Sequence, residues 1–186
     1  MRIISGKLKS KSINYIKDST TRPLKDSVKE NIFNVLNHSN QIEVSIKEAN
    51  ILDLYSGIGS FGLECISREA NKVTFIEQSK NTFNILKENL VALSVIDQAI
   101  IINDKIENFI DKINKKKFDI FFLDPPFADK DFIKILQSIK KNKLYKKKHI
   151  VIIHREKNAT DNLDGLVNTF ITKRYGRSKI IFGVFN

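Results

Sequence analysis

The sequence predicts an α/β fold, in which a mostly parallel sheet carries helices on both faces and ends in a C-terminal antiparallel hairpin. From residue 50 onward, short apolar segments typical of buried strands alternate with segments whose apolar residues recur at helical spacing. Such repeated strand–helix units favour a parallel sheet, because each helix returns the chain to the start of a neighbouring strand. After residue 166, two strand-like segments follow each other around a short turn at residues 175–178, which favours an antiparallel pair.

The expected elements follow this alternation along the chain. Short apolar segments predict strands at residues 51–55, 72–77, 99–102, 118–123, 149–153, 167–173 and 179–185. Helical spacing predicts helices at about residues 24–36, from the glycine-rich turn to about 68, and at 80–93, 105–114 and 129–140. Residues 1–40 are expected to form a small basic extension, with short strands near 2–4 and 12–16 that turn at Gly6 or beyond. Residues 41–186 are expected to form the main domain.

The charge of the chain points to a polyanionic partner. Its 186 residues carry a net charge of +11, with a pI of about 9.6. Lys and Arg gathered on one face would release counterions from phosphates and so favour nucleic acid. A general enrichment in Lys, Asn and Ile would add the same charge without a binding role, and the composition leaves both explanations open. The lysine-rich run at residues 140–148 is equally open between an RNA-binding segment and a solvated loop.

Several absences narrow the class of protein. The single cysteine, Cys65, cannot form an internal disulfide, so a reducing cytoplasm is the expected compartment. Cys65 itself is expected to be a core residue. No apolar run reaches about eighteen residues, and the first residues lack the apolar segment of a signal peptide, so no membrane association is expected. His38, His149 and His154 do not have the spacing of metal ligands, and no metal is expected.

A glycine-rich turn follows the strand expected at residues 51–55. Gly57, Gly59 and Gly62 match the G-x-G-x-x-G spacing of nucleotide-binding turns. Glycine lets a ligand approach the backbone closely, because it has no Cβ atom. Glu77 ends the next strand, where a carboxylate can accept hydrogen bonds from both hydroxyls of a ribose. The pattern therefore predicts a cofactor that contains a nucleoside.

The glycine spacing alone fits a nicotinamide dinucleotide as well as S-adenosylmethionine. Asp53 lies just ahead of the turn. A carboxylate there would attract a cationic amino-acid group and repel a pyrophosphate, so it favours S-adenosylmethionine. A nicotinamide-dependent oxidoreductase is the alternative that this turn leaves open.

The second chemical signal is the tetrapeptide Asp124-Pro125-Pro126-Phe127, which closes the strand expected at 118–123. Ligands of such sheets bind beyond the carboxyl ends of the strands, so the tetrapeptide is expected beside the glycine-rich turn. Two prolines remove two N–H donors and leave the Asp124 carboxylate and the Pro125 carbonyl as acceptors for an exocyclic amine. Such acceptors free the lone pair of the nitrogen for methylation, and Asp124 can take up the released proton. Phe127 offers a stacking face for an unstacked base.

Both signals are similar to those of known enzymes. The tetrapeptide resembles the Asp/Asn-Pro-Pro-aromatic motif of amino-methyltransferases that act on nucleic acids, and residues 53–62 resemble their glycine-rich motif. Residues 2–6, 21–30 and 33–36, and Tyr175-Gly176 near the C-terminus, resemble the RsmD family of bacterial 16S rRNA guanine-N2 methyltransferases. The resemblance extends over nearly the whole chain.

The resemblance implies a class I methyltransferase fold with a seven-stranded sheet, S-adenosylmethionine as cofactor, and 16S rRNA of the small ribosomal subunit as substrate. A monomer is expected, because nothing in the sequence demands a dimer. The expected catalytic residues are Asp124, Pro125, Pro126 and Phe127. The expected cofactor-binding residues are Asp53, Tyr55, Gly57, Gly59, Glu77 and Asp104. The residues expected to contact RNA are Arg2, Lys7 and Arg22.

Two other functions are compatible with these residues. A DNA adenine-N6 methyltransferase shares the Asp-Pro-Pro-Phe motif, although the sequence holds no separate target-recognition domain. A non-catalytic RNA-binding or ribosome-assembly factor could keep the fold, but it would not need the acceptors that Asp124 and Pro125 supply.

Overall fold

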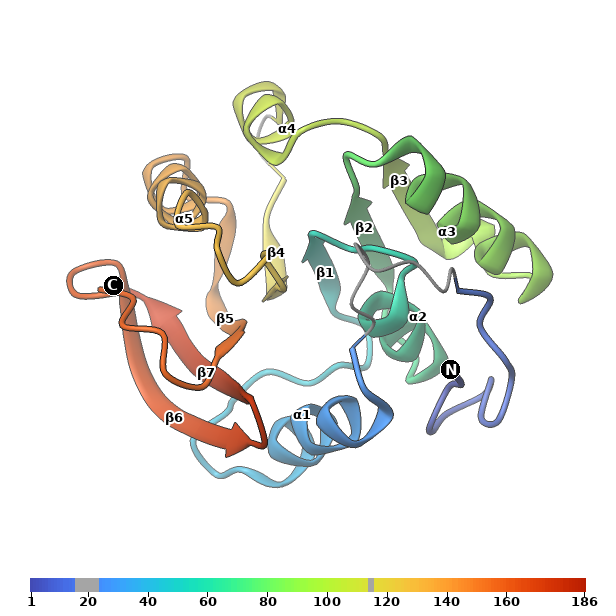
Figure 1. Ribbon diagram of the computed structural model, residues 1–186, viewed down its shortest axis with the longest axis horizontal. Coiled ribbons are helices and arrows are strands. Elements are labelled where there is room, and N and C mark those ends of the chain that lie inside the picture. The colour runs from blue at the N-terminus through green and yellow to red at the C-terminus, as the bar shows by residue number, and fades with distance from the viewer. Residues whose placement is uncertain (16–23, 114–115) are drawn as a thin grey trace.

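The computed structural model describes residues 1–15, 24–113 and 116–186, and Figure 1 shows its sheet with helices on both faces. Within these residues the strands are β1 (Asn50–Leu54), β2 (Lys72–Ile76), β3 (Ala99–Ile102), β4 (Phe118–Leu123), β5 (Tyr145–Glu156), β6 (Val167–Tyr175) and β7 (Ser178–Phe185). The helices are α1 (Asp26–His38), α2 (Ser60–Ser67), α3 (Lys80–Ala92), α4 (Ile106–Lys112) and α5 (Phe132–Lys141), with a 3-10 helix, η1 (Ile96–Gln98), ahead of β3.

The seven strands form a sheet in the order β3-β2-β1-β4-β5-β7-β6. Strands β1 to β5 pair in parallel, whereas β7 is antiparallel to both β5 and β6. The prediction of a mostly parallel seven-stranded sheet with a C-terminal antiparallel hairpin is therefore confirmed. The strand order reverses between β1 and β4, and ligands of such sheets bind at this point, beyond the carboxyl ends of the strands.

Alternate residues of the central strands pack into two hydrophobic cores, one on each face of the sheet. On β4, Ile120 and Phe122 belong to the core that includes residues of α1, α2 and α3. Phe121 and Leu123 belong to the core that includes residues of α4 and α5. A parallel strand covered on both faces has no polar side, which explains why residues 118–123 are almost continuously apolar in the sequence.

The extension at residues 1–40 shares a core with the main domain. Ile3, Ile13 and Phe33 pack in the same cluster as Ile51 of β1, on the face that α2 covers. The division at residue 40 stays a prediction. Cys65 is fully buried in this cluster, so its predicted place in the core is confirmed.

The short strands expected in the extension are reduced to one isolated bridge, between Arg2 and Ser12. The chain reverses at residues 6–9, where Gly6 has φ of +83° and its carbonyl accepts a hydrogen bond from the N–H of Lys9. A Cβ atom at Gly6 would lie 2.0 Å from the backbone oxygen of Ser67. The turn therefore packs too closely against the end of α2 for any residue but glycine.

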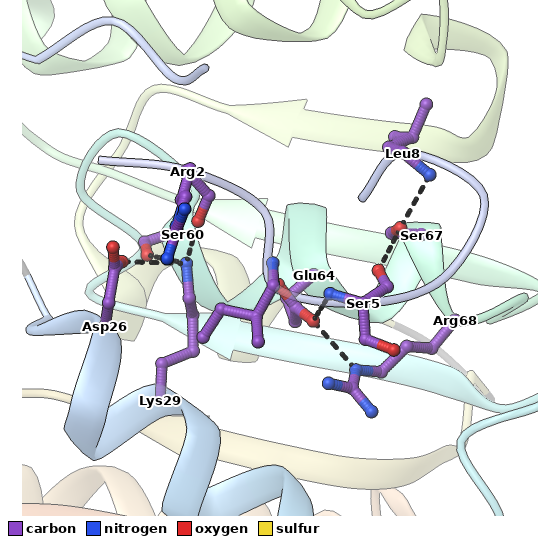
Figure 2. Close-up of polar contacts among 10 residues, drawn as sticks. Arg2, Ser5, Leu8, Asp26, Lys29, Ser60, Glu64, Ser67 and Arg68 are labelled. Carbon is purple, nitrogen blue, oxygen red and sulfur yellow. Dashed lines mark hydrogen bonds and ion pairs between the residues drawn. The ribbon is translucent and has the colours of Figure 1, made fainter. Parts of the chain in front are cut away.

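A buried carboxylate of α2 holds the chain just before this turn (Figure 2). Glu64 is fully buried and accepts hydrogen bonds from the N–H groups of Ile4 (2.7 Å) and Ser5 (3.0 Å). It also accepts one from Nε of Arg68 (2.9 Å). The N-terminal segment is thus held to α2 by hydrogen bonds to a charged group, which are stronger than those between neutral groups.

A buried ammonium group of α1 contacts the same segment, as Figure 2 also shows. Lys29 is fully buried, and its Nζ donates to the carbonyl oxygen of Arg2 (2.7 Å) and lies 3.6 Å from the Asp26 carboxylate. Burial lowers the pKa of Lys29, while Glu64 and Asp26 oppose that shift. The two buried charges of opposite sign, on α1 and α2, are joined through the N-terminal segment.

Most boundaries differ from those predicted by a few residues, and contacts or backbone geometry explain three of the differences. β5 begins at residue 145 instead of 149, because the lysine run continues the strand: Lys146 pairs with Asp119 (2.8 Å) of β4. α5 begins at residue 132 instead of 129, because the Asp129 carboxylate accepts the N–H of Asp131 and forms a turn there. β1 ends at residue 54, because Tyr55 has φ of +59°. None of the helices that the structure describes has the length and apolar character needed to cross a membrane.

Candidate active site

A cavity of about 820 Å³ opens at the carboxyl ends of β1, β2 and β4, within the size range of small-molecule sites. Its walls come from the turn after β1, the end of β2, the start of α3, the segment after β4 and the start of α4. Leu24 and Tyr15 add contacts from the N-terminal extension. The two signals of the sequence, the glycine-rich turn and Asp-Pro-Pro-Phe, therefore meet in one cavity, as predicted from the order of the strands.

The glycine-rich turn takes a conformation that favours glycine. Gly57 and Gly59 have φ of +55° and +88°. A Cβ atom on Gly59 would lie 2.5 Å from Leu86, so Gly59 serves the packing of the turn on α3. A Cβ atom on Gly57 would meet no atom within 4 Å, and Gly57 lines the cavity. Of these two predicted residues, Gly57 faces the cavity and Gly59 shapes the turn beneath it.

Asp53 lies under the turn with one oxygen unpaired. Its Oδ2 accepts a hydrogen bond from the N–H of Gly62 (3.0 Å), whereas its buried Oδ1 has no partner among the described residues. Asp53 is 1% exposed, and this burial raises its pKa well above the usual value; nearby Asp124 and Glu77 act in the same direction. A buried carboxylate oxygen without a partner is costly, and a cationic ligand group in the cavity would remove that cost.

Glu77 follows directly after β2 and bonds the glycine-rich turn. Its carboxylate accepts hydrogen bonds from the N–H groups of Gly57 (2.9 Å) and Ser79 (2.7 Å). Burial raises its pKa, although these two hydrogen bonds oppose the shift. Each carboxylate oxygen keeps a lone pair, so Glu77 can still accept from hydroxyl groups of a ligand while it holds the turn in place.

Every charged residue that lines the cavity, among those the structure describes, is an acid: Asp53, Glu77, Glu107, Asp124, Asp129 and Asp131. Such a wall repels phosphates and attracts cations. The cavity thus suits a positively charged cofactor and disfavours a pyrophosphate. Of the two cofactors that the glycine spacing allows, this charge favours S-adenosylmethionine over a nicotinamide dinucleotide.

Arg155, at the end of β5, holds the backbone of the Asp-Pro-Pro-Phe segment. Its guanidinium donates to the carbonyl oxygens of Pro126 (3.1 Å) and Phe127 (3.3 Å). It is 1% exposed, pairs with both oxygens of Asp161 (3.0 Å each), and lies over the ring of Phe132. Two carbonyl acceptors of the segment are therefore occupied by Arg155, while that of Pro125 bonds to none of the described residues.

His154, the neighbouring residue on β5, contacts Asp124 directly. Its Nδ1 lies 2.8 Å from Oδ1 of Asp124, and its ring meets that of Phe127 edge to face at 5.8 Å. Tyr55 joins the other side of the site, because its hydroxyl donates to Oδ2 of Asp129 (3.0 Å). The segment after β4 is thus tied both to β5 and to the turn after β1.

Asp104, Lys7 and Arg2 do not line the cavity. The Asp104 carboxylate accepts from Asn108 (2.7 Å), which lowers its pKa, and Glu107 lines the cavity instead. Lys7 is near the far end of α2, where its backbone bonds to Ser67. Arg2 is exposed, its carbonyl oxygen accepts from Lys29 of α1, and it does not line the cavity. Arg22 lies outside the described residues.

Sequence reasoning gave no role to His154 and Arg155. Their only signal is their place just after the apolar centre of β5, at the carboxyl edge of the sheet where ligands bind. No group of three or more His, Cys, Asp or Glu side chains among the described residues could hold a metal ion.

Comparison with known proteins agrees with this geometry. A family model described as conserved hypothetical protein 95 matches residues 1–184. Ribosomal RNA small subunit methyltransferase D of Buchnera aphidicola subsp. Baizongia pistaciae is 33% identical over 181 residues, which are 97% of this chain and 88% of that protein. The Haemophilus influenzae protein of the same name is 39% identical over 129 residues, 68% of this chain and 64% of that protein. The crystal structure of a Haemophilus influenzae methylase matches with a TM-score of 0.78 at 29% identity, over 100% of this chain and 98% of that one. This chain therefore belongs to the RsmD-like family of methyltransferases that the conserved hypothetical protein 95 model describes.

Proposed function

We propose that the protein transfers a methyl group from S-adenosylmethionine to the exocyclic N2 amine of a guanine in 16S rRNA of the small ribosomal subunit. One observation carries the proposal: Asp124 and Pro125 line the same cavity as Asp53 and Gly57. The acceptors for an amine and the groups suited to the cofactor are therefore close enough to act on two ligands in contact.

The described residues fit S-adenosylmethionine better than a dinucleotide. The unpaired Oδ1 of Asp53 would receive the ammonium group of the cofactor, and Glu77 would accept from its ribose hydroxyls. Gly57 leaves room for the cofactor against the backbone. The acidic wall stabilises the positive charge that this cofactor carries. When bound, the cofactor supplies an electrophilic methyl group on its sulfonium.

Asp124 and Pro125 would prepare the amine for attack. His154 already bonds Oδ1 of Asp124, and Arg155 already bonds the carbonyls of Pro126 and Phe127. Oδ2 of Asp124 and the Pro125 carbonyl bond to no described residue, so both are the best placed to accept from the amine. Together they accept the two amine hydrogens and turn the nitrogen lone pair toward the cofactor. The nitrogen gains a methyl group and loses a proton, which Asp124 accepts.

The choice of RNA rests on the relatives and on charge. The relatives named above are called ribosomal RNA small subunit methyltransferases, and a net charge of +11 suits a large polyanion. The base must leave its stack to enter the cavity, and Phe127, which lines the wall, offers a ring for it to stack on.

The test is a methyl-transfer assay with labelled S-adenosylmethionine and small ribosomal subunits that lack methylation, with naked 16S rRNA and duplex DNA in parallel. Label on rRNA, recovered as N2-methylguanine, supports the proposal. Label on DNA adenine alone would keep the amine chemistry and reject the substrate. Bound cofactor without label on any substrate would favour a non-catalytic assembly factor.

A pair of variants tests the role of Asp124. Asp124→Ala should lower turnover by a factor of about 10²–10⁴, the usual contribution of a positioned acid or base. Its affinity for the cofactor should remain close to that of the wild type. Asp111→Ala removes an exposed carboxylate of α4, outside the cavity, and should leave turnover unchanged. Normal turnover in Asp124→Ala would reject the mechanism.

A further inference from the structure

We infer that His154 is a positioning residue for the reaction: its Nδ1–H group fixes the Asp124 carboxylate so that Oδ2 is presented to the target amine. The inference deepens the proposed function and rests on it. It assigns a role to a residue that lies outside both the glycine-rich turn and the Asp-Pro-Pro-Phe segment.

The contact between the two side chains is short and shielded from water. Nδ1 of His154 and Oδ1 of Asp124 are 2.8 Å apart, the usual length of a hydrogen bond to a charged acceptor. The His154 side chain is 5% exposed and that of Asp124 is 20% exposed. Water therefore competes little for this bond, whereas one edge of the Asp124 carboxylate still reaches the cavity.

The chemistry of the pair settles which atom donates. A carboxylate has no hydrogen to give, so the N–H at Nδ1 of His154 donates the hydrogen bond and Asp124 accepts that bond. Nε2 of His154 is buried without a hydrogen-bond partner among the described residues. Among the described residues, the bond to Asp124 is thus the one polar contact of the ring.

The backbone around His154 limits how far its ring can move. His154 pairs with Ile180 of β7 in the antiparallel ladder, and β5 pairs with β4 on its other side. The ring also packs edge to face against Phe127 at 5.8 Å. A donor on a central strand, packed against the segment that it orients, holds a carboxylate in place better than a donor on a loop.

His154 and Arg155 act on different parts of the same segment. Consecutive residues of a strand point to opposite faces of the sheet. Arg155 bonds the carbonyls of Pro126 and Phe127, and His154 bonds the side chain of Asp124. Arg155 thus sets the path of the backbone, while His154 sets the rotation of the carboxylate that the backbone carries.

The test compares two amides that differ by one methylene. In His154→Asn, the side-chain N–H₂ group can occupy the position of Nδ1, whereas in His154→Gln it extends toward the position of Nε2. We expect His154→Asn to keep kcat within about tenfold of the wild type, a change of roughly 1.4 kcal/mol. His154→Gln should lose about 100-fold in kcat, the effect of misplacing a reacting group by about 1 Å. The KM for small ribosomal subunits and the affinity for S-adenosylmethionine, measured by calorimetry, should not change in either variant.

A second histidine of β5 supplies the control. His149 is also buried, but it bonds the carbonyl of Lys146 and the N–H of Phe185, far from Asp124. His149→Gln should change thermal stability and leave kcat unchanged. Equal kcat in His154→Asn and His154→Gln would overturn the inference, whether both are active or both are impaired. Inactive wild-type protein that still binds the cofactor would instead reject the proposed function.

Discussion

Replacing Asp53 by asparagine should raise the Tm of the protein and, at the same time, weaken its binding of S-adenosylmethionine. In Asp53→Asn, the amide oxygen of the new side chain keeps the hydrogen bond from Gly62, while the charge on the unpaired, buried Oδ1 is removed. The new Nδ2 group at that position still lacks a partner, but it is neutral, and an unpaired buried group costs more when it is charged than when it is neutral; we take the difference as about 1–3 kcal/mol. Relief of that cost corresponds to a rise in Tm of roughly 2–12 °C for a domain of this length.

The pH dependence of this gain has a definite sign. Burial raises the pKa of Asp53 in the folded protein. The stability linked to its protonated form is therefore complete below the unfolded pKa of about 3.9 and is lost as pH rises through the folded pKa. The difference in Tm between Asp53→Asn and the wild type should be small near pH 4 and should grow toward neutral pH.

The same substitution should raise the Kd of S-adenosylmethionine. Loss of one hydrogen bond to a charged group, worth about 1.5–3 kcal/mol, corresponds to a roughly 10- to 150-fold weaker Kd. Calorimetry at pH 7.5 would measure this, and the binding of S-adenosylhomocysteine, which has the ammonium group without the sulfonium, should weaken equally. A variant that binds both ligands like the wild type and melts at a lower temperature would refute the reasoning about Asp53.

Three further substitutions test the contacts of Arg155, Glu64 and His149. In Arg155→Lys, the ammonium group cannot make both hydrogen bonds to Asp161 and both hydrogen bonds to the carbonyls of Pro126 and Phe127. We expect kcat to fall by about tenfold or more. Unchanged kcat would show that the segment after β4 keeps its conformation without these bonds. Glu64→Gln should cost about 1–3 kcal/mol of unfolding free energy and speed hydrogen exchange of the N-terminal amides, and slow exchange there would contradict the contacts of Figure 2. Burial lowers the pKa of His149, so the stability linked to its neutral ring is present above about pH 6.5 and is lost as pH falls through the pKa of the folded protein. Denaturant titration at several pH values should show this loss in the wild type and not in His149→Gln. Parallel curves of unfolding free energy against pH for the two proteins would refute the prediction.

Much of the fold could be predicted because its signals are local. The apolar runs of β1 and β4 and the glycine spacing after β1 each lie within a few neighbouring residues. The order of these elements then brings the glycine-rich turn and Asp124 to the same edge of the sheet. Knowledge of a recurrent fold class was enough to place both signals in one cavity.

The parts that could not be predicted depend on contacts between distant residues. His154 lies 30 positions beyond Asp124, and Arg155 lies 29 beyond Pro126, so neither forms a spacing pattern with its partner. The start of β5 was hidden for the same reason, because Lys146 is stabilised in a strand by Asp119, 27 residues earlier. Asp104 followed the expected strand but bonds within its own turn and helix.

The acidic wall of the cavity has a consequence for how salt should act on this protein. If RNA is the substrate, as proposed, the acidic wall would repel the phosphates that flank the target base, while basic residues elsewhere in the chain would attract the rest of the RNA. Added salt screens both effects over a Debye length of about 8–10 Å near physiological ionic strength. For an RNA substrate, a modest increase in salt should therefore ease entry of the base, and a larger one should release the RNA. Turnover should pass through a maximum as ionic strength rises, unlike the steady decline expected of an enzyme whose active site and outer surface have the same sign of charge.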